Sequence, residues 1–457
     1  MSRLWSRVGI GLWLLWHAVS AAAANPSKKT ILGLGLPVVF IETVDGVIPS
    51  SESVYDKNGE WMGVVPLEKV PGRIYIQVGD SVVYDSGEYL DGSSGMTIRV
   101  RGNSTALRDK KPYKVKLQQK ADLLRRGDKR YNSKDWVLLK RGYSVDDLIG
   151  FEVNRLMGMP YQPAYEYVNL FMNGNYRGLY IIAENVKRDN DCRINVDKQT
   201  GFIVELDPFY YHEDLFFITA NSKFGFTYKY PDSDDVDEDT NRRVMISIKA
   251  MEDAVGSGDY SSIIDIDSWA RFVLAHDILA TWDTYGSNMF YAKYDNSRSS
   301  RIFIPCLWDF DSVMKNSGLW GCKHEAYLFT QLFESDNPDF CNAYHQLWDE
   351  LHETVFEQID SLLSHWMDSN LCKAINFSMR YDPEWYSSRG TFTKQLSNTS
   401  AWFQERHQWL MEHINDIPQF MIEKPKYAHD LNGRRIYLNG WITKGIYIVD
   451  GKKYYVK

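Results

Sequence analysis

Four polar residues in the second half of the chain have the chemistry and the spacing that phosphoryl transfer needs. Asn288 follows Asp283 by five positions, and Asp309 and Asp311 flank a single phenylalanine. In such a reaction one carboxylate receives the proton of the attacking hydroxyl, while an amide and further carboxylates hold magnesium. We therefore predict Asp283 as the catalytic carboxylate and Asp309 as the principal metal ligand. Asn288 and Asp311 are predicted as additional ligands, because hard oxygen atoms suit Mg²⁺.

A helix and two strands are expected to position these side chains. Apolar residues recur at helical spacing over 266–280, immediately before Asp283. Two strand-like runs follow at 288–293 and 301–308, and the second run ends at Asp309. A polar loop, a strand pair and a second acidic turn occur in this order around the metal site of protein kinases.

Each of these patterns also has a purely structural explanation. An Asp and an Asn five positions apart, or two Asp around a Phe, also occur in surface turns and strand caps. On the phosphate side, Lys114 and Lys116 alternate along one predicted strand and so share a face. Lys116 is the predicted phosphate-binding residue and Lys114 its alternative, although both also suit a solvated sheet face.

The chain divides into a β-rich first part and a helix-rich second part. Short β-type runs separated by Gly, Ser and Asp fill residues 36–232, and one helix near 148–157 interrupts them. Helical spacing of apolar residues dominates 233–420, and 425–457 reads as a small terminal β hairpin. This order predicts an α+β fold with two lobes like those of a protein kinase.

The beginning of the chain resembles a signal peptide. Arg3 and Arg7 precede an apolar run that ends in three alanines, which predicts a signal peptide over residues 1–24. An uncleaved N-terminal anchor is the alternative. No later run reaches eighteen apolar residues, so we predict no transmembrane segment.

The net charge argues against one class of partner, and the cysteine content limits the possible disulfides and metal sites. The formal net charge of −8 argues against a nucleic-acid partner, because duplex-binding proteins usually present a basic face. The chain has 5 cysteines, and an odd number leaves at least one thiol outside any intramolecular disulfide. No cysteine pair has zinc-ribbon spacing, so a structural zinc site is not predicted.

Several longer motifs occur in a fixed order along most of the chain. They are Arg-Gly-Asn-Ser-Thr at 101–105, Lys-Lys-Pro-Tyr at 110–113, Asp-Trp-Val-Leu-Leu at 135–139, Asn-Gly-Asn-Tyr-Arg-Gly-Leu-Tyr at 173–180, Val-Glu-Leu-Asp at 204–207 and Trp-Asp-Phe-Asp at 308–311. The ordered set resembles the CotH-type secreted atypical protein kinases, the spore coat protein CotH family. The resemblance implies a kinase-like fold, ATP with Mg²⁺ (or Mn²⁺), and phosphate transfer to Ser or Thr of extracytoplasmic proteins.

Taken together with the residues above, the resemblance suggests a nucleotide site formed by Lys116, Lys114, Arg101 and Glu152. Arg101 is expected to support the phosphate-binding lysine, and Glu152 to pair with that lysine from its helix. The chain departs from the family at Gly150-Phe151, where CotH relatives often carry a basic residue and Asn. A kinase-shaped binding or assembly protein of the cell surface, without strong catalysis, is therefore the alternative function.

The C-terminal tail resembles the β tails that direct bacterial proteins to the type IX secretion route. Together with the signal peptide it predicts an exported protein that is periplasmic, on the cell surface or extracellular. A plain terminal hairpin packed on the body is the structural alternative. A carbohydrate-active surface protein is a third possibility, since the chain has 15 Trp and 29 Tyr.

Overall fold

The structure is a computed structural model of the 457-residue chain. It describes residues 25–417 except 103, 190–191, 223, 283–287, 322–323, 325 and 386–389, together with the backbone of four short strands between 427 and 456. The predicted signal peptide, Asp283 and Cys322 lie outside the described residues.

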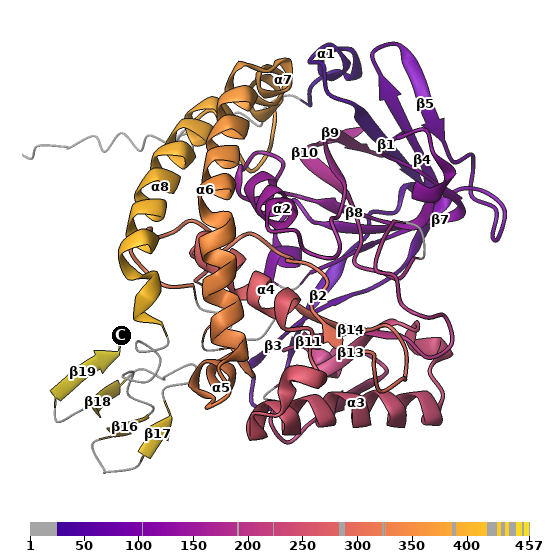
Figure 1. Ribbon diagram of the computed structural model, residues 1–457. Coiled ribbons are helices and arrows are strands. Elements are labelled where there is room, and N and C mark those ends of the chain that lie inside the picture. Colours follow the sequence, from indigo (N-terminus) through magenta and orange to yellow (C-terminus); the bar gives the residue numbers. More distant parts are fainter. Residues whose placement is uncertain are drawn as a thin grey trace, which may run out of the picture.

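A closed barrel of seven strands forms the first part of the molecule (Figure 1). Around the ring the order is β1, β9, β10, β8, β7, β6 and β4, and pairing of β1 with β4 closes it. An eighth strand, β5 (Ser81–Asp85), pairs with β4 alone. The ring strands are β1 Val38–Thr43, β4 Val70–Val78, β6 Met96–Val100, β7 Tyr113–Ala121, β8 Ser133–Leu139, β9 Tyr165–Met172 and β10 Asn175–Glu184.

The closed barrel shows that the predicted two-lobed, protein-kinase-like fold is wrong. The β-rich first part is present, and β9 and β10 form a hairpin around Asn173-Gly174. However, β1 pairs in parallel with β9 as well as antiparallel with β4, so the ring has no free edge. Sequence periodicity predicts strands but not which distant strands pair, and this one pairing decides between an open sheet and a barrel.

Side chains on both faces of the barrel wall are buried. Trp136 and Leu138 of β8 belong to the apolar cluster inside the barrel, whereas Val137 between them joins the larger cluster outside it. Successive side chains of a strand point to opposite faces, so a continuous apolar run is expected where both faces are covered. The outer cluster continues into the helices and the second sheet.

A second sheet of five strands lies beside the barrel, with α3 packed below it in Figure 1. Its order is β12, β13, β11, β14 and β15, which combines strands from both sides of the acidic stretch near residue 232. The strands are β11 Phe202–Asp207, β12 Phe216–Ile218, β13 Gly225–Tyr230, β14 Met289–Lys293 and β15 Ile302–Phe303.

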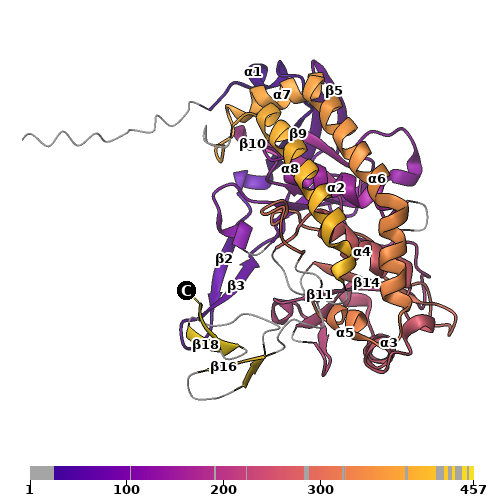
Figure 2. The same ribbon diagram turned by 60° about the vertical axis from the view of Figure 1, so that its left-hand side comes forward.

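A hairpin links the barrel to the second sheet. β2 (Ser51–Tyr55) and β3 (Trp61–Pro66) pair only with each other and extend from the barrel toward that sheet (Figure 2). The carbonyl oxygen of Met62 lies 3.0 Å from Nε2 of His212, in the segment between β11 and β12. The hairpin therefore forms one wall of the space between the two sheets.

Long helices cover the opposite side of the barrel. α6 and α8 run side by side in both views, and α2 lies between them and the barrel (Figures 1 and 2). Tyr167 of β9 contacts Trp366 of α6 and Phe392 of α8, with ring centroids 5.8 Å apart in each pair. The helices are α1 Lys28–Leu32, α2 Asp146–Leu156, α3 Glu238–Ser257, α4 Ile266–Ile278, α5 Phe329–Glu334, α6 Asp339–Asp368, α7 Asn370–Met379 and α8 Phe392–His413. Of the helices in the described part of the chain, none is long and apolar enough to cross a membrane.

One buried ion pair joins the barrel to the helical part. Nζ of Lys110, just before β7, lies 2.5 Å from Oδ2 of Asp382, which follows α7. The same oxygen accepts a hydrogen bond of 2.6 Å from the backbone N–H of Leu179 in β10. Both side chains of the pair are almost fully buried, so each charge depends on the other for compensation.

The C-terminal strands form a four-stranded sheet of their own. The order is β17 (Arg435–Tyr437), β16 (Tyr427–Asp430), β18 (Gly445–Val449) and β19 (Lys452–Val456). The predicted terminal hairpin corresponds to β18 and β19, while its Asp-Gly turn lies outside the described residues. Cys192, Cys306, Cys341 and Cys372, the four described cysteines, are all free thiols.

Candidate functional site

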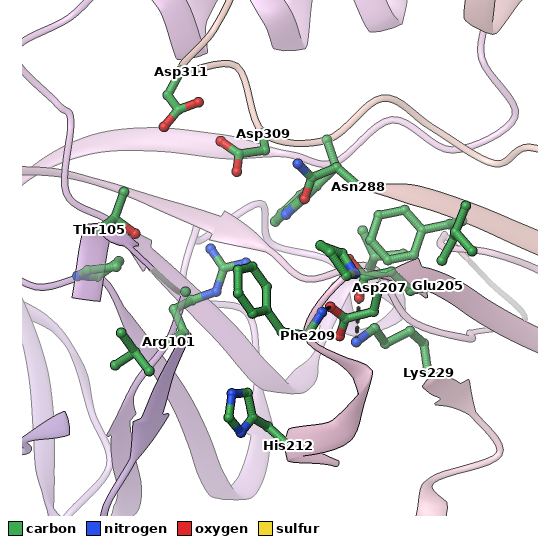
Figure 3. Close-up of a pocket in the computed structure, with 18 of the residues that line it drawn as sticks. Arg101, Thr105, Glu205, Asp207, Phe209, His212, Lys229, Asn288, Asp309 and Asp311 are labelled. Carbon is green, nitrogen blue, oxygen red and sulfur yellow. Dashed lines mark hydrogen bonds and ion pairs between the residues drawn. The ribbon is translucent and has the colours of Figure 1, made fainter. Parts of the chain in front are cut away.

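A cavity of about 1150 Å³ lies between the barrel and the second sheet. Cationic side chains enter it from the barrel, and most of its carboxylates come from the second sheet and the loop after β15 (Figure 3). The barrel contributes Arg99, Arg101, Lys114, Lys140 and Arg141. The cavity is large enough for a nucleotide and part of a second substrate.

The structure brings together the three predicted metal ligands it describes. Asp309, Asp311 and Asn288 all line the cavity, and in Figure 3 Asp309 lies between the other two. Asp309 and Asn288 have left-handed backbone conformations, with φ of 65° and 57°. Asp and Asn tolerate this conformation better than most residues. Asn288 directly precedes β14, whereas Asp309 lies six residues after the end of β15, which is shorter than the predicted run at 301–308.

Strand pairing explains the position of Asn288. Met289, the first residue of β14, pairs with Leu206 of β11, so the next position along each strand places Asn288 beside Asp207. Glu205 of β11 forms an ion pair of 2.5 Å with Lys229 of β13. The second sheet thus presents two carboxylates, one amide and one ammonium group to the cavity.

The residues that directly follow α4 are tied to the segment that follows Asp311. The backbone N–H of Trp282 donates to the carbonyl of Ser312 at 3.2 Å, and that of Met314 donates to Leu279 at 2.8 Å. These bonds hold the end of α4 against the acidic turn. Asp283 is adjacent to Trp282 in sequence, but its own placement lies outside the described residues.

Two basic residues predicted from sequence face the cavity from the barrel wall. Arg101 follows β6, and its guanidinium carbon lies 5.6 Å from the ring centre of Trp308. Burial lowers the pKa of Arg101. Burial also lowers the pKa of Lys114 to about 8, although Asp135 opposes the shift. Both side chains are half-buried and present positive charge to the cavity, which suits the binding of phosphate oxygens.

The other two predicted nucleotide-site residues lie outside the cavity lining. Lys116 is exposed on β7, two positions beyond Lys114. Glu152 on α2 accepts a hydrogen bond of 2.9 Å from Arg155 and another of 2.9 Å from the hydroxyl of Tyr165. The structure therefore does not bring Glu152 together with a phosphate-binding lysine.

Several cavity residues were not predicted as site residues from sequence. Glu205 and Asp207 alternate at the end of a strand, a signal that could have suggested two side chains on one face. Asp147 lies in the first turn of α2. Acidic residues are common there because their negative charge interacts favourably with the positive end of the helix dipole. Arg141 follows β8 in a turn without a recognisable pattern. Only the tertiary contacts make these residues candidates.

Two carboxyl groups in the cavity have elevated pKa values. Burial raises the pKa of Asp147 to about 7; Arg141 opposes the shift, and the negative charges of Asp146, Asp309 and Asp311 reinforce it. Burial raises the pKa of Asp207 to about 6, and Glu205 acts in the same direction. Clusters of carboxylates with shifted pKa values are typical of functional sites.

The donor atoms fit a magnesium-type cation. Within the described residues, no three His, Cys, Asp or Glu side chains are gathered closely enough to form a complete metal cage. Mg²⁺ does not require such a cage, because it is usually held by one or two carboxylates and keeps several waters. Asp309, Asp311 and the amide oxygen of Asn288 supply suitable oxygen ligands.

Comparison with known protein families agrees with this chemistry. A family model described as CotH kinase protein matches residues 98–416, well over half of the chain. The chain belongs to the CotH kinase protein family. The matched region begins at β6, so this CotH family region includes the cationic wall, the second sheet and the covering helices. A search of curated proteins finds no matching relative.

Proposed function

We propose that this CotH family protein transfers the γ-phosphate of ATP, with Mg²⁺ or Mn²⁺, to Ser or Thr hydroxyl groups of proteins outside the cytoplasm. One observation carries the proposal. Asp309, Asp311 and Asn288, which could hold a cation, face Arg101 and the other barrel cations across one cavity. Phosphoryl transfer depends mainly on positioning and on stabilising negative charge, and this arrangement provides both.

The protein groups divide into two roles in this proposal. Arg101, Lys114 and Arg141 neutralise the phosphate oxygens from the barrel side. Asp309 and Asp311, with the amide of Asn288, hold the cation that neutralises the remaining phosphate charge. The acceptor oxygen bonds to the γ-phosphorus as the bond from that phosphorus to the bridging oxygen breaks, and ADP leaves.

The hydroxyl proton of the acceptor requires a base. Asp283 is proposed for this role, since it follows α4 and precedes Asn288 by five positions. Carboxylates commonly orient or accept this proton in phosphoryl transfer.

Export is part of the proposal, on the basis of the N-terminal and C-terminal sequence patterns. A signal peptide over 1–24 would deliver the protein from the cytoplasm, and the 425–457 tail would direct it to the surface through the type IX route. Cell fractionation of the full chain and of a chain lacking 425–457 tests this. Loss of surface localisation in the shortened protein is expected, and unchanged localisation would contradict a sorting role.

Transfer of label from γ-labelled ATP tests the enzymatic proposal. The full chain is incubated with Mg²⁺ or Mn²⁺ and a Ser-rich protein, beside Asp309→Asn and the exposed control Asp253→Asn. Incorporation should fall at least about 100-fold in Asp309→Asn, because charge stabilisation in the transition state is lost. The control, an equal change on the surface of α3, should match the wild type.

The same assay separates an enzyme from a binding protein. No transfer, together with no rise in melting temperature on adding ATP, would contradict the kinase proposal, because a bound nucleotide must stabilise the folded state. A rise in melting temperature without transfer would favour the kinase-shaped binding or assembly protein.

A further inference from the structure

One face of α2 lies along the segment that carries Asp309 and Asp311. Near the end of α2, the side-chain oxygen of Asn154 accepts a hydrogen bond of 2.8 Å from the backbone N–H of Leu307. One turn earlier, the ring of Phe151 lies 6.3 Å from that of Trp308 and 5.3 Å from that of Phe310. The helix and the segment therefore run past each other in a fixed register.

The next turn of the same face carries Asp147. Residues three to four positions apart share a helix face, so 154, 151 and 147 follow one another along it. Leu307 lies beside the turn that carries Asn154, and Phe310 lies beside the turn that carries Phe151. Nη2 of Arg141, which also pairs with Asp146 in the first turn of α2, lies 3.5 Å from the carbonyl oxygen of Phe310. The register thus places Asp147 beside the acidic turn at 309–311.

Asp147 is buried, yet one of its oxygens is unsatisfied. The residue is 7% exposed and lines the cavity. Its Oδ2 has no hydrogen-bond partner among the residues that the structure describes. The nearest cation is Nε of Arg141 at 3.8 Å, whereas Nη2 of that arginine is directed to Asp146 at 2.6 Å. A buried carboxylate oxygen without a donor is costly, so a missing partner is expected in the cavity.

We propose that Asp147 is a third acidic residue of the cation site, and that its Oδ2 accepts hydrogen bonds from water molecules bound to Mg²⁺ or Mn²⁺. The inference rests on the proposed function insofar as it assumes a cation at Asp309 and Asp311. A phosphate group does not suit the carboxylate form of Asp147, because two anions repel each other. A hydrated cation satisfies it and also offsets the charge of the two neighbouring carboxylates.

Contact through water agrees with the geometry. The described carboxylates do not form a three-ligand cage, and Mg²⁺ keeps several of its waters when proteins bind it. Acidic groups that hold such waters tune affinity without touching the metal, and losing one typically weakens metal binding about 10- to 100-fold.

Titration with Mn²⁺, followed by the electron paramagnetic resonance signal of the free ion, tests the role of Asp147. The full chain is compared with Asp147→Asn, Asp309→Asn and the matched control Glu152→Gln, each with and without a non-hydrolysable ATP analogue. Glu152 lies on the same helix, but its carboxylate is already paired outside the cavity. We expect Asp147→Asn to weaken Mn²⁺ binding about 10-fold or more, and Glu152→Gln to bind like the wild type.

Each other outcome has a distinct meaning. Wild-type affinity in Asp147→Asn, with binding lost in Asp309→Asn, would overturn the role of Asp147 and leave the proposed function intact. No Mn²⁺ binding by the wild type, even with the nucleotide analogue, would overturn both. If Asp147→Asn does not fold, as judged by circular dichroism, the smaller Asp147→Ser replaces it, with the same expected loss and the same contradicting result.

Discussion

Lys114 and Lys116 lie on the same strand but differ in their exposure and in whether they reach the cavity. They share a face of β7, but successive residues advance about 3.3 Å along a strand, so the second lysine lies beyond the cavity. Lys114 is half-buried in the cavity wall, and Lys116 is exposed. The alternation of side chains predicted the shared face correctly, whereas the position of the cavity along the strand depends on the second sheet.

Replacing Lys114 tests whether this lysine holds phosphate. Lys114→Met should weaken ATP binding about 10-fold or more, because a desolvated charge-assisted contact is lost. The pKa of about 8 adds a pH signature, since Lys114 loses its positive charge as the pH rises through that value. Wild-type affinity for ATP, measured by calorimetry, should fall between pH 7 and 9.

Lys116→Met is the matched control, because it removes the same charge from an exposed position of the same strand. It should bind ATP like the wild type and keep the fall above pH 8, while Lys114→Met should lose that pH dependence. A larger loss in Lys116→Met than in Lys114→Met would contradict the assignment and favour the lysine first predicted from the sequence.

Asp147 should lower the stability of the metal-free protein at pH values above the pKa of its carboxyl group in the folded state. Its folded pKa of about 7 lies above the ordinary value of 3.8, so the folded state holds its proton more tightly than the unfolded state. Its stabilising contribution is therefore present below pH 4 and is lost as the pH rises through 7. Asp147→Asn should melt a few degrees higher than the wild type at pH 8, with little difference near pH 4. An equal difference at both pH values would contradict a titrating Asp147.

At the scale of elements, the contact between α2 and the acidic turn depends on a glycine. A Cβ atom at Gly150 would lie 2.0 Å from the ring of Phe310, far inside van der Waals contact. This close approach explains why a glycine occupies position 150. Helix and acidic turn must therefore separate if a side chain is added.

Gly150→Ala should lower the free energy of unfolding by about 1 to 3 kcal/mol, because overpacking outweighs the better helix propensity of alanine. Urea denaturation measures the change, and Mn²⁺ affinity should fall with it as Asp309 and Asp311 shift. Gly256→Ala on α3 is the control, since the nearest atom to its added Cβ is 3.8 Å away. That variant should be neutral or slightly stabilised. A stabilised Gly150→Ala would show that the acidic turn is free to move.

At the scale of the whole molecule, the buried pair of Lys110 and Asp382 fastens the helical part to the barrel. Asp382→Ala would leave the ammonium of Lys110 without its counter-ion and the N–H of Leu179 without its acceptor. The expected loss is about 3 to 5 kcal/mol of unfolding free energy, measured by urea denaturation. The double variant Lys110→Met/Asp382→Leu should recover at least half of this loss, because no charge stays buried alone. A double variant as unstable as the single one would contradict that explanation.

Local sequence patterns were enough to predict the classes of secondary structure and the family. Period-2 and period-3.6 patterns predicted the β-rich part over 36–232, the helix near 148–157 and the helix-rich part over 233–420, because these patterns reflect local backbone geometry. The ordered motifs also predicted CotH membership, and Asp309, Asp311 and Asn288 were chosen from a short stretch of sequence. Asn288 lies just before β14, and Asp309 and Asp311 follow its partner β15 by six and eight residues, so the pairing of two strands that are close in sequence brings the three residues to one region.

Three features became apparent only from the three-dimensional packing. They are the closed barrel, the position of Lys114 as the cavity lysine, and the presence of Arg141 and Asp147 in the site. Each depends on contacts between segments far apart in sequence: β1 with β9, the barrel with the second sheet, and α2 with the acidic turn. Such contacts arise from the burial of apolar faces, which is non-directional and leaves no short-range pattern. The partners of a charged side chain in this cavity are therefore set by how those faces pack.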